Sequence, residues 1–118
     1  MRKPPHELRR LANATRYSWQ GLRAAFRHER AFRLEVVAAA VLLPLAVWLG
    51  EGPLERALLV AVVLLVMVAE LLNSAVEATV NRIGTEHHPL AGRAKDLGSA
   101  AVFVSVVLAG AVWLLILL

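Results

Sequence analysis

The stretch LGSAAVFVSVVLAGAVWLLILL, at residues 97–118, carries no charged side chain over its 22 residues. A membrane-spanning helix needs about 20 apolar residues to cross a hydrocarbon core of ~30 Å, so this stretch alone is long enough. Two earlier apolar runs, at residues 36–49 and 57–69, are shorter, but residues that tolerate the membrane interface extend both of them. We therefore predict three transmembrane helices, which span residues 31–49, 54–82 and 93–118.

Charged residues are segregated along the chain. Of the 118 residues, 58% are hydrophobic, and 13 Lys and Arg outnumber 9 Asp and Glu. Nine of these 13 basic residues lie between Arg2 and Arg33, before the first apolar run. This composition excludes intrinsic disorder and more than one soluble domain. Because cysteine is absent, a disulfide scaffold, a thiolate metal site and a cysteine nucleophile are excluded as well.

The basic segments predict the orientation of the chain. The N-terminal arm and the polar residues 82–95 lie on the same side of a three-span protein, so the positive-inside rule places both in the cytoplasm. Residues 50–56 and the C-terminus then face outward, with Trp48 and Trp113 near the outer interface. We expect no signal peptide, because more than 30 residues rich in charge precede the first apolar run.

We make separate predictions for several residues within or near the ends of the spans. Arg33 and Glu35 are expected to reach from the first span toward lipid headgroups. Pro44 is expected to kink that span. Residues 85–92 include Pro89 and are predicted to form a loop, in which histidines are solvated.

Residues 6–27 are predicted to form an amphipathic helix, because apolar and polar residues each recur at three- and four-residue spacing. A basic amphipathic helix beside a membrane span is typical of one that lies in the interface. A nucleic-acid-binding or calmodulin-type helix is the alternative, but no soluble domain accompanies it and we expect no nucleic-acid partner. The predicted fold is a single all-α membrane domain over residues 1–118, with a surface helix and three spans that assemble as an oligomeric helical bundle.

Three polar residues, Glu70, Asn73 and Glu77, interrupt the second span. Their spacing of three and four residues places them on one face of a helix. An ionised carboxylate in hydrocarbon costs roughly 3 kcal/mol, so this row must face a partner, a water-filled cavity or a metal. Glu77 lies near the cytoplasmic interface and Glu70 about 10 Å deeper along the axis. One end of the row can therefore meet a cytosolic solute and the other a lipid.

Charged groups at the cytoplasmic depth match the needs of phosphoryl transfer. Glu29 and Glu77 offer oxygen ligands for Mg²⁺, and Lys95 offers a cation for a phosphate. By its depth, Glu70 is the candidate base for a lipid hydroxyl. From the residues alone, interfacial salt bridges explain the presence of Glu29, Lys95 and Asp96 as well as a role in phosphoryl transfer does. The nucleotide-binding motifs of soluble kinases are absent from the sequence.

Four stretches of the chain resemble the bacterial integral-membrane diacylglycerol kinase family. They are YSWQGLRAAF at 17–26, ERAFRLE at 29–35, ELLNSAVEATVNRIG at 70–84 and GRAKDLGSAA at 92–101. The resemblance extends over nearly the whole chain from about Arg10. It implies an enzyme that transfers the γ-phosphate of Mg-ATP to the free hydroxyl of diacylglycerol, giving phosphatidic acid. It also implies a homotrimer in the bacterial inner membrane, with active sites shared between subunits.

The resemblance further implies roles for individual residues. Glu70 would be the general base, and Glu29 and Glu77 would hold Mg²⁺. The implied nucleotide-binding residues are Tyr17, Glu29, Asn73, Glu77, Glu86, His87, His88, Lys95 and Asp96. The implied lipid-binding residues are Arg10, Asn13, Ala14, Thr15, Arg16, Ser18, Trp19, Arg23, Ala24, Ala25, Phe26, Ala31, Phe32, Arg33, Leu34, Glu35, Trp48, Arg56, Glu70, Ser99 and Trp113.

Three positions depart from the family pattern. Asn81 stands where close members have Asp, Leu34 where Gln is familiar, and His87 where Tyr is common. These departures concern nucleotide affinity and lipid preference rather than the reaction class. Three alternatives stay open: an undecaprenol kinase, which shares the motifs; a small proton-coupled multidrug transporter, which requires four spans and one central Glu; and a non-catalytic interaction subunit.

Overall fold

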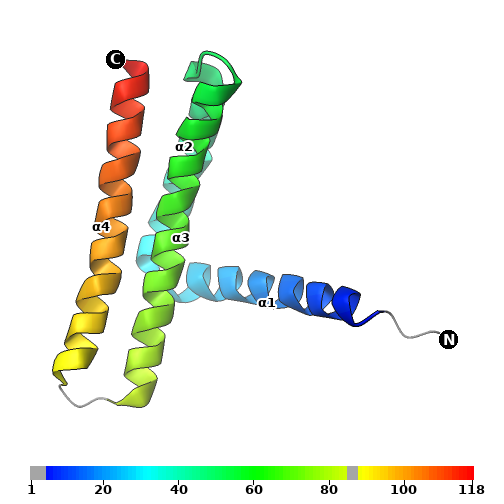
Figure 1. Cartoon of the computed structure of the whole chain (residues 1–118), viewed down its shortest axis with the longest axis vertical. Coiled ribbons are helices and arrows are strands. Elements are labelled where there is room, and N and C mark those ends of the chain that lie inside the picture. The colour runs from blue at the N-terminus through cyan, green and yellow to red at the C-terminus, as the bar shows by residue number, and fades with distance from the viewer. Residues whose placement is uncertain (1–4, 85–87) are drawn as a thin grey trace.

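The computed structural model describes residues 5–84 and 88–118. Within them the chain forms four helices and no strand: α1 (His6–His28), α2 (Arg30–Leu49), α3 (Pro53–Ile83) and α4 (Pro89–Leu117). Helices α2, α3 and α4 run side by side, whereas α1 leaves the bundle at a steep angle (Figure 1). Each of the three bundle helices is long and apolar enough to cross a bilayer. The predicted all-α membrane fold is therefore confirmed.

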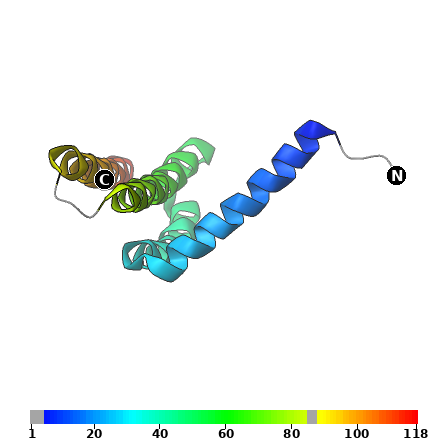
Figure 2. The same cartoon turned by 90° about the horizontal axis from the view of Figure 1, so that it is seen from below.

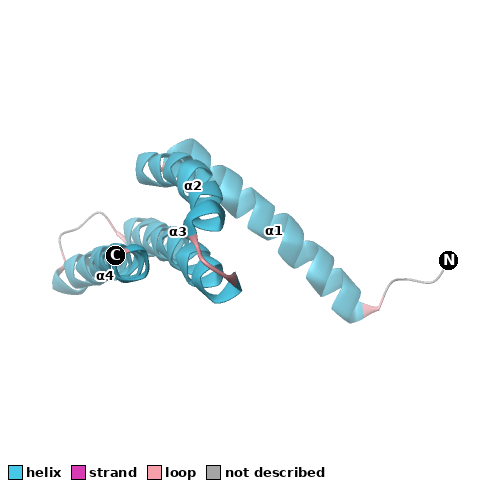
Figure 3. Ribbon diagram, turned by 90° about the horizontal axis from the view of Figure 1, so that it is seen from above, coloured by secondary structure: helices cyan, strands magenta, loops and turns pink. Residues whose placement is uncertain are grey.

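Helix α3 lies between α2 and α4 and contacts both (Figure 3). On α2 the buried residues Phe32, Ala39 and Ala46 recur every seven residues, which keeps them on one face of the helix. Small residues such as these alanines let helix backbones approach closely, and close approach is what drives helix association in lipid. Helix α3 contributes Leu59 and Val63 to the buried interior. The core of the bundle thus lies along α3.

The turn between α2 and α3 depends on two glycines. Gly52 has φ +94°, a backbone conformation that L-residues rarely adopt. A Cβ on Gly50 would lie 2.6 Å from Cγ of Arg56, so a larger residue does not fit there. Arg56 in turn donates from Nε to the carbonyl oxygen of Val47 at 3.0 Å. These contacts fix the tight reversal that sets α2 against α3.

Two contacts join α4 to α3. Trp113 donates from Nε1 to the carbonyl oxygen of Leu59 at 3.1 Å. Nearer the other end, a Cβ placed on Gly98 would collide with Oδ1 of Asn73 and lie 3.3 Å from its Cγ. Gly98 therefore allows a close approach between α3 and α4, as small residues commonly do in membrane helices. No residue of α4 between Pro89 and Leu117 is buried, so its remaining faces are exposed in a single chain.

Helix α1 runs across the direction of the three bundle helices (Figure 1). It is basic and amphipathic, and such helices lie in the plane of the interface with their apolar face toward the lipid. Figure 2 shows α1 extending away from the three bundle helices. The last turns of α3 and the first turns of α4 continue beyond the level of α1 (Figure 1). These turns therefore extend past α1, at the end of the bundle opposite the α2–α3 turn.

One prediction about the helix ends needs correction. Helix α4 begins at Pro89 rather than at residue 93, so the predicted loop over residues 85–92 is too long. The reason is an N-terminal cap: the Leu90 N–H donates to Nδ1 of His88 at 3.0 Å, and a proline tolerates the first helical turn. Helix α2 continues unbroken through Pro44. The other helix ends agree with prediction to within one residue.

The α3–α4 contact can be tested with two glycine substitutions. Gly98→Ala forces a methyl group against the Asn73 carboxamide, and overpacking of this kind costs about 1–3 kcal/mol of unfolding free energy. Gly110→Ala is the matched control, since nothing lies within 4 Å of the added Cβ. Unfolding in mixed detergent micelles measures both variants. Equal stability of the two would contradict the packing described.

Candidate functional site

Glu70 occupies the interior of the bundle. It is 8% exposed and is the one buried charged or polar residue among residues 5–84 and 88–118. Glu35 of α2 faces it across the α2–α3 interface. The buried Oε2 of Glu35 has no hydrogen-bond partner within the described chain. A carboxyl oxygen can accept a hydrogen bond, so this atom is open to a ligand that brings a donor such as a hydroxyl group.

The inward position of Glu35 corrects the expectation that it reaches toward lipid headgroups. The spacing of residues along α2 could have predicted this inward position. Glu35 lies three residues after Phe32 and four before Ala39, both of which are buried, so it shares the face of α2 that packs in the bundle.

The predicted row along α3 is present, and a second element adds to it. Glu70, Asn73 and Glu77 lie on this one helix, and the last two are half-buried. Glu29 is the residue between α1 and α2, and we call this bend the elbow. The carboxyl groups of Glu29 and Glu77 both interact electrostatically with that of Glu70. Glu29 also lines a cavity of about 720 Å³ between α1 and α3, together with Ser74. The carboxyl groups of Glu29, Glu70 and Glu77 thus lie in the part of the bundle that α1 meets, near enough for Glu29 and Glu77 to interact electrostatically with Glu70.

The carboxylates fit a metal that arrives with a nucleotide. No group of three or more His, Asp or Glu side chains in the described residues could hold a metal alone. Mg²⁺ in phosphate-binding sites, however, takes one or two carboxylates and completes its octahedron with phosphate oxygens and water. Glu29 and Glu77 supply two carboxylates from two different elements. This donor set suits Mg²⁺ bound to phosphates.

Helix α4 brings further polar groups to the same level. It runs antiparallel to α3, and Gly98 meets Asn73, so Lys95 and Asp96 lie at about the level of Glu77. Both side chains are exposed and therefore accessible to a solute. His88 uses Nδ1 to cap α4. Glu86 and His87, which the resemblance assigns to the nucleotide site, lie outside the described residues.

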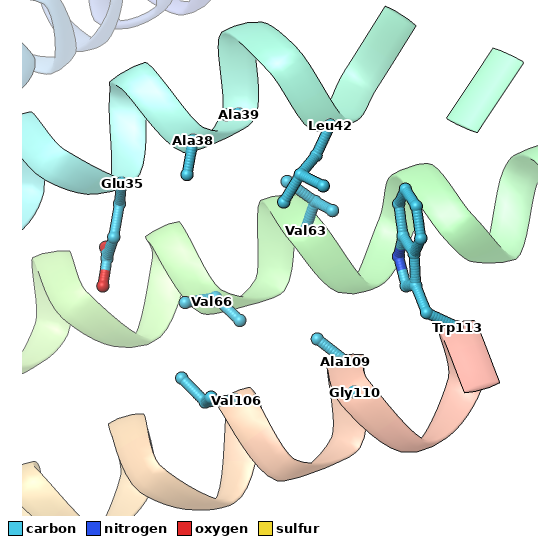
Figure 4. Close-up of a pocket in the computed structure, with 10 residues that line it drawn as sticks. All are labelled: Glu35, Ala38, Ala39, Leu42, Val63, Val66, Val106, Ala109, Gly110 and Trp113. Carbon is cyan, nitrogen blue, oxygen red and sulfur yellow. The ribbon is translucent and has the colours of Figure 1, made fainter. Parts of the chain in front are cut away.

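An apolar cavity of about 340 Å³ extends from Glu35 to Trp113 between α2, α3 and α4 (Figure 4). Glu35 closes one end with its carboxyl group, and the indole of Trp113 stands at the other. The walls between them are aliphatic or glycine: Ala38, Ala39, Leu42, Val63, Val66, Val106, Ala109 and Gly110. The cavity therefore joins a polar end to an apolar channel along the bundle axis.

Three predicted lipid-binding residues lie at the far end of the bundle from Glu70. Arg56 precedes Glu70 by 14 residues on α3, about 21 Å along the axis, and its Nε is bonded to the α2 end. Trp48 is exposed at that same end of α2, and Trp113 is bonded to α3 there. The structure does not bring these residues to the carboxylates.

The predicted residues of α1 are mostly exposed along an arm that extends away from the bundle (Figure 2). Arg16 lies over the ring of Tyr17, 5.3 Å from its centroid. The exposed residues are Arg10, Asn13, Ala14, Thr15, Arg16, Tyr17, Ser18, Trp19, Arg23, Ala24 and Phe26, whereas Ala25 is buried. A single chain therefore leaves most of this group away from Glu70.

The remaining predicted residues lie near the elbow or on α4. Ala31 and Leu34 are exposed, and Phe32 is buried. Arg33, expected to reach toward headgroups, instead bonds the end of α1. Ser99 is exposed on α4.

This arrangement defines a class of protein: a three-span membrane protein whose buried Glu70, with Glu35 beside it, lies at one end of an apolar cavity. Comparison with known proteins identifies the class further. The family model described as prokaryotic diacylglycerol kinase matches residues 16–117. The diacylglycerol kinase of Haemophilus influenzae is 56% identical over 106 residues, which cover 90% of each chain. That of Escherichia coli K12 is 50% identical over 108 residues, 92% of this chain and 88% of the relative. That of Helicobacter pylori 26695 is 41% identical over 105 residues, 89% of this chain and 82% of the relative.

The chain therefore belongs to the prokaryotic diacylglycerol kinase family. It is a lipid kinase and a multi-pass bacterial membrane protein. The resemblance seen in the sequence is confirmed. The transporter and non-catalytic alternatives are wrong, and the described residues form three spans rather than the four that the transporter requires.

Proposed function

We propose that this protein transfers the γ-phosphate of ATP to the free hydroxyl of diacylglycerol, giving phosphatidic acid and ADP. The observation that carries the proposal is the buried Glu70, with Glu35 beside it and two further carboxylates toward the water side. The relatives are named diacylglycerol kinases, which supports the choice of acceptor.

Glu70 acts as the general base. It accepts the proton of the acceptor hydroxyl as the hydroxyl oxygen attacks the γ-phosphorus, while the bond from that phosphorus to the β–γ bridging oxygen breaks and ADP leaves. The unpartnered Oε2 of Glu35 offers a second acceptor that orients the same hydroxyl. Burial of Glu70 excludes water, which is the competing acceptor for the phosphoryl group.

The water-side groups receive the nucleotide. Glu29 and Glu77 would hold Mg²⁺, which when bound neutralises charge on the transferring phosphate. Lys95 places its ammonium group against the phosphates, and Asn73 and Asp96 orient them. All of these residues belong to the elbow, α3 or α4 near the level at which α1 meets the bundle.

The apolar cavity accommodates an acyl chain of the acceptor. A lipid whose glycerol hydroxyl lies at Glu70 extends its chains away from the water side, along the bundle axis. The aliphatic lining from Glu35 toward Trp113 follows the same direction (Figure 4). Small-molecule binding cavities typically have mostly apolar walls and a few polar groups, and this cavity has that kind of lining.

The enzyme works as a homotrimer with shared sites in the bacterial inner membrane, its N-terminus in the cytoplasm. The exposed faces of α4 support an oligomer, because a single chain leaves them without a protein partner. The α1 arm supports shared sites, since its polar residues project away from the Glu70 of their own chain (Figure 2). The number three follows from the resemblance alone.

An acceptor assay tests the proposed reaction. Purified protein in lipid bicelles with Mg-ATP is given diacylglycerol or undecaprenol, and the phosphorylated lipid is separated and counted. We expect phosphatidic acid as the main product. Phosphorylation of undecaprenol without phosphorylation of diacylglycerol would overturn the proposal.

The role of Glu70 is tested by Glu70→Gln, which keeps the shape of the side chain but removes its basicity. We expect kcat for lipid phosphorylation to fall by at least about 100-fold, because general bases contribute that much or more. Glu51→Gln is the matched control, since Glu51 is exposed in the α2–α3 turn. Circular dichroism verifies that both variants are folded. A Glu70→Gln variant as active as the control would exclude the assigned role.

The absence of cysteine makes the orientation directly testable. Single cysteines replace Glu51 in the α2–α3 turn or Asn81 near the end of α3, both of which are exposed. A membrane-impermeant maleimide should label the Glu51→Cys variant in intact spheroplasts and the Asn81→Cys variant after permeabilisation. The reverse pattern would show that the N-terminus is outside.

A further inference from the structure

Arg33 reaches back from α2 to the end of α1. Its Nη1 donates to the carbonyl oxygens of Phe26 and Arg27, at 3.0 Å each. The final carbonyl groups of an α-helix lack helical N–H donors, so these two bonds satisfy acceptors that the helix itself leaves open. A cation at this position is also favourable, because the carbonyl dipoles give a helix C-terminus partial negative charge.

The bend that Arg33 crosses consists of one residue. Glu29 separates α1 from α2 with φ −111° and ψ 107°, an extended conformation. Its N–H donates to the carbonyl oxygen of Ala25 at 2.8 Å, and its own carbonyl oxygen accepts from the Arg33 N–H at 3.2 Å. The direction in which Glu29 presents its carboxylate therefore depends on the backbone rotations of this single residue.

Neither backbone hydrogen bond of Glu29 restrains these rotations. The bond to Ala25 moves with α1, and the bond from the Arg33 N–H moves with α2, so both survive a change in the angle between the helices. The guanidinium bonds differ, because they join a side chain of α2 to the backbone of α1. Among the described residues they are the side-chain hydrogen bonds that cross the bend.

We propose that Arg33 is a positioning residue that sets the α1–α2 elbow and thereby aims the Glu29 carboxylate toward Glu77. This inference rests on the proposed function, in which Glu29 and Glu77 hold the divalent cation together. Glu29 is half-buried against α3, where a small swing of α1 separates it from Glu77. Loss of the Arg33 bonds therefore weakens the binding of the metal–nucleotide complex first.

This role differs from the lipid contact that the resemblance implies for Arg33. A lipid contact affects KM for the acceptor and leaves metal binding unchanged. A positioning role weakens metal binding even when no lipid acceptor is present. The two roles are therefore separated by a binding measurement that requires no catalysis.

The test uses Mn²⁺ as the probe, with a non-hydrolysable ATP analogue and the full-length protein in bicelles. Because Mn²⁺ also binds the free nucleotide, the dissociation constant of the metal–nucleotide complex is taken from the protein-dependent enhancement of water proton relaxation, with the same mixture without protein as the blank. We expect Arg33→Gln to raise it about tenfold, the lower end of the effect of groups that orient metal ligands. Arg33→Lys, which keeps a cation with N–H donors, should recover part of the loss. Circular dichroism verifies the helix content of each variant.

Arg30→Gln is the matched control. Arg30 is exposed one residue after the elbow, and its side chain makes no hydrogen bond within residues 5–84 and 88–118. Mn²⁺ binding by Arg33→Gln equal to that of Arg30→Gln would overturn the inference, as would a change confined to KM for the lipid.

The inference and the proposed function can fail separately. If the wild-type protein phosphorylates no lipid, the proposed function fails. If the wild-type protein is active and Arg33→Gln binds Mn²⁺ normally, the inference alone fails. Wild-type protein that does not bind Mn²⁺ with the nucleotide would overturn both.

Discussion

The burial of a carboxyl group in helix α3 is the constraint on which the rest of the structure depends. An ionised carboxylate in the middle of a membrane helix costs roughly 3 kcal/mol, so α3 needs neighbours that cover Glu70. Helix α2 covers it at close range because Ala39 and Ala46 let the two backbones approach. That approach also brings Glu35 against Glu70 and leaves the apolar cavity open on the other side.

Much of this architecture could be predicted from the sequence, because a bilayer permits few structures. Backbone groups in hydrocarbon must be hydrogen-bonded within the segment, so long apolar runs form helices and their length gives the spans. The row of Glu70, Asn73 and Glu77 was equally accessible, since one helix fixes the face on which residues at these spacings lie. Both predictions use only local geometry.

What the sequence could not supply is contact between elements. Long side chains near a span end are free either to reach headgroups or to bind protein, and hydropathy does not distinguish the two. Arg33 and Glu35 both turned inward, one to the end of α1 and the other to Glu70. The early start of α4 was missed for a similar reason, because the cap depends on the side-chain conformation of His88.

Two buried polar atoms indicate what a single chain leaves unfinished. Oε2 of Glu35 and Oδ1 of Asn73 have no hydrogen-bond partner within the described residues, although both lie in an apolar bundle. Buried polar atoms without partners are rare in proteins and costly in lipid, where water does not compensate them. Both atoms can accept a hydrogen bond, so a donor from outside the described chain would satisfy each of them. Glu35 lies at the lipid end of the row and Asn73 nearer the water end. The single chain therefore leaves two acceptor atoms open along the bundle, one beside the apolar cavity and one where α3 meets α4.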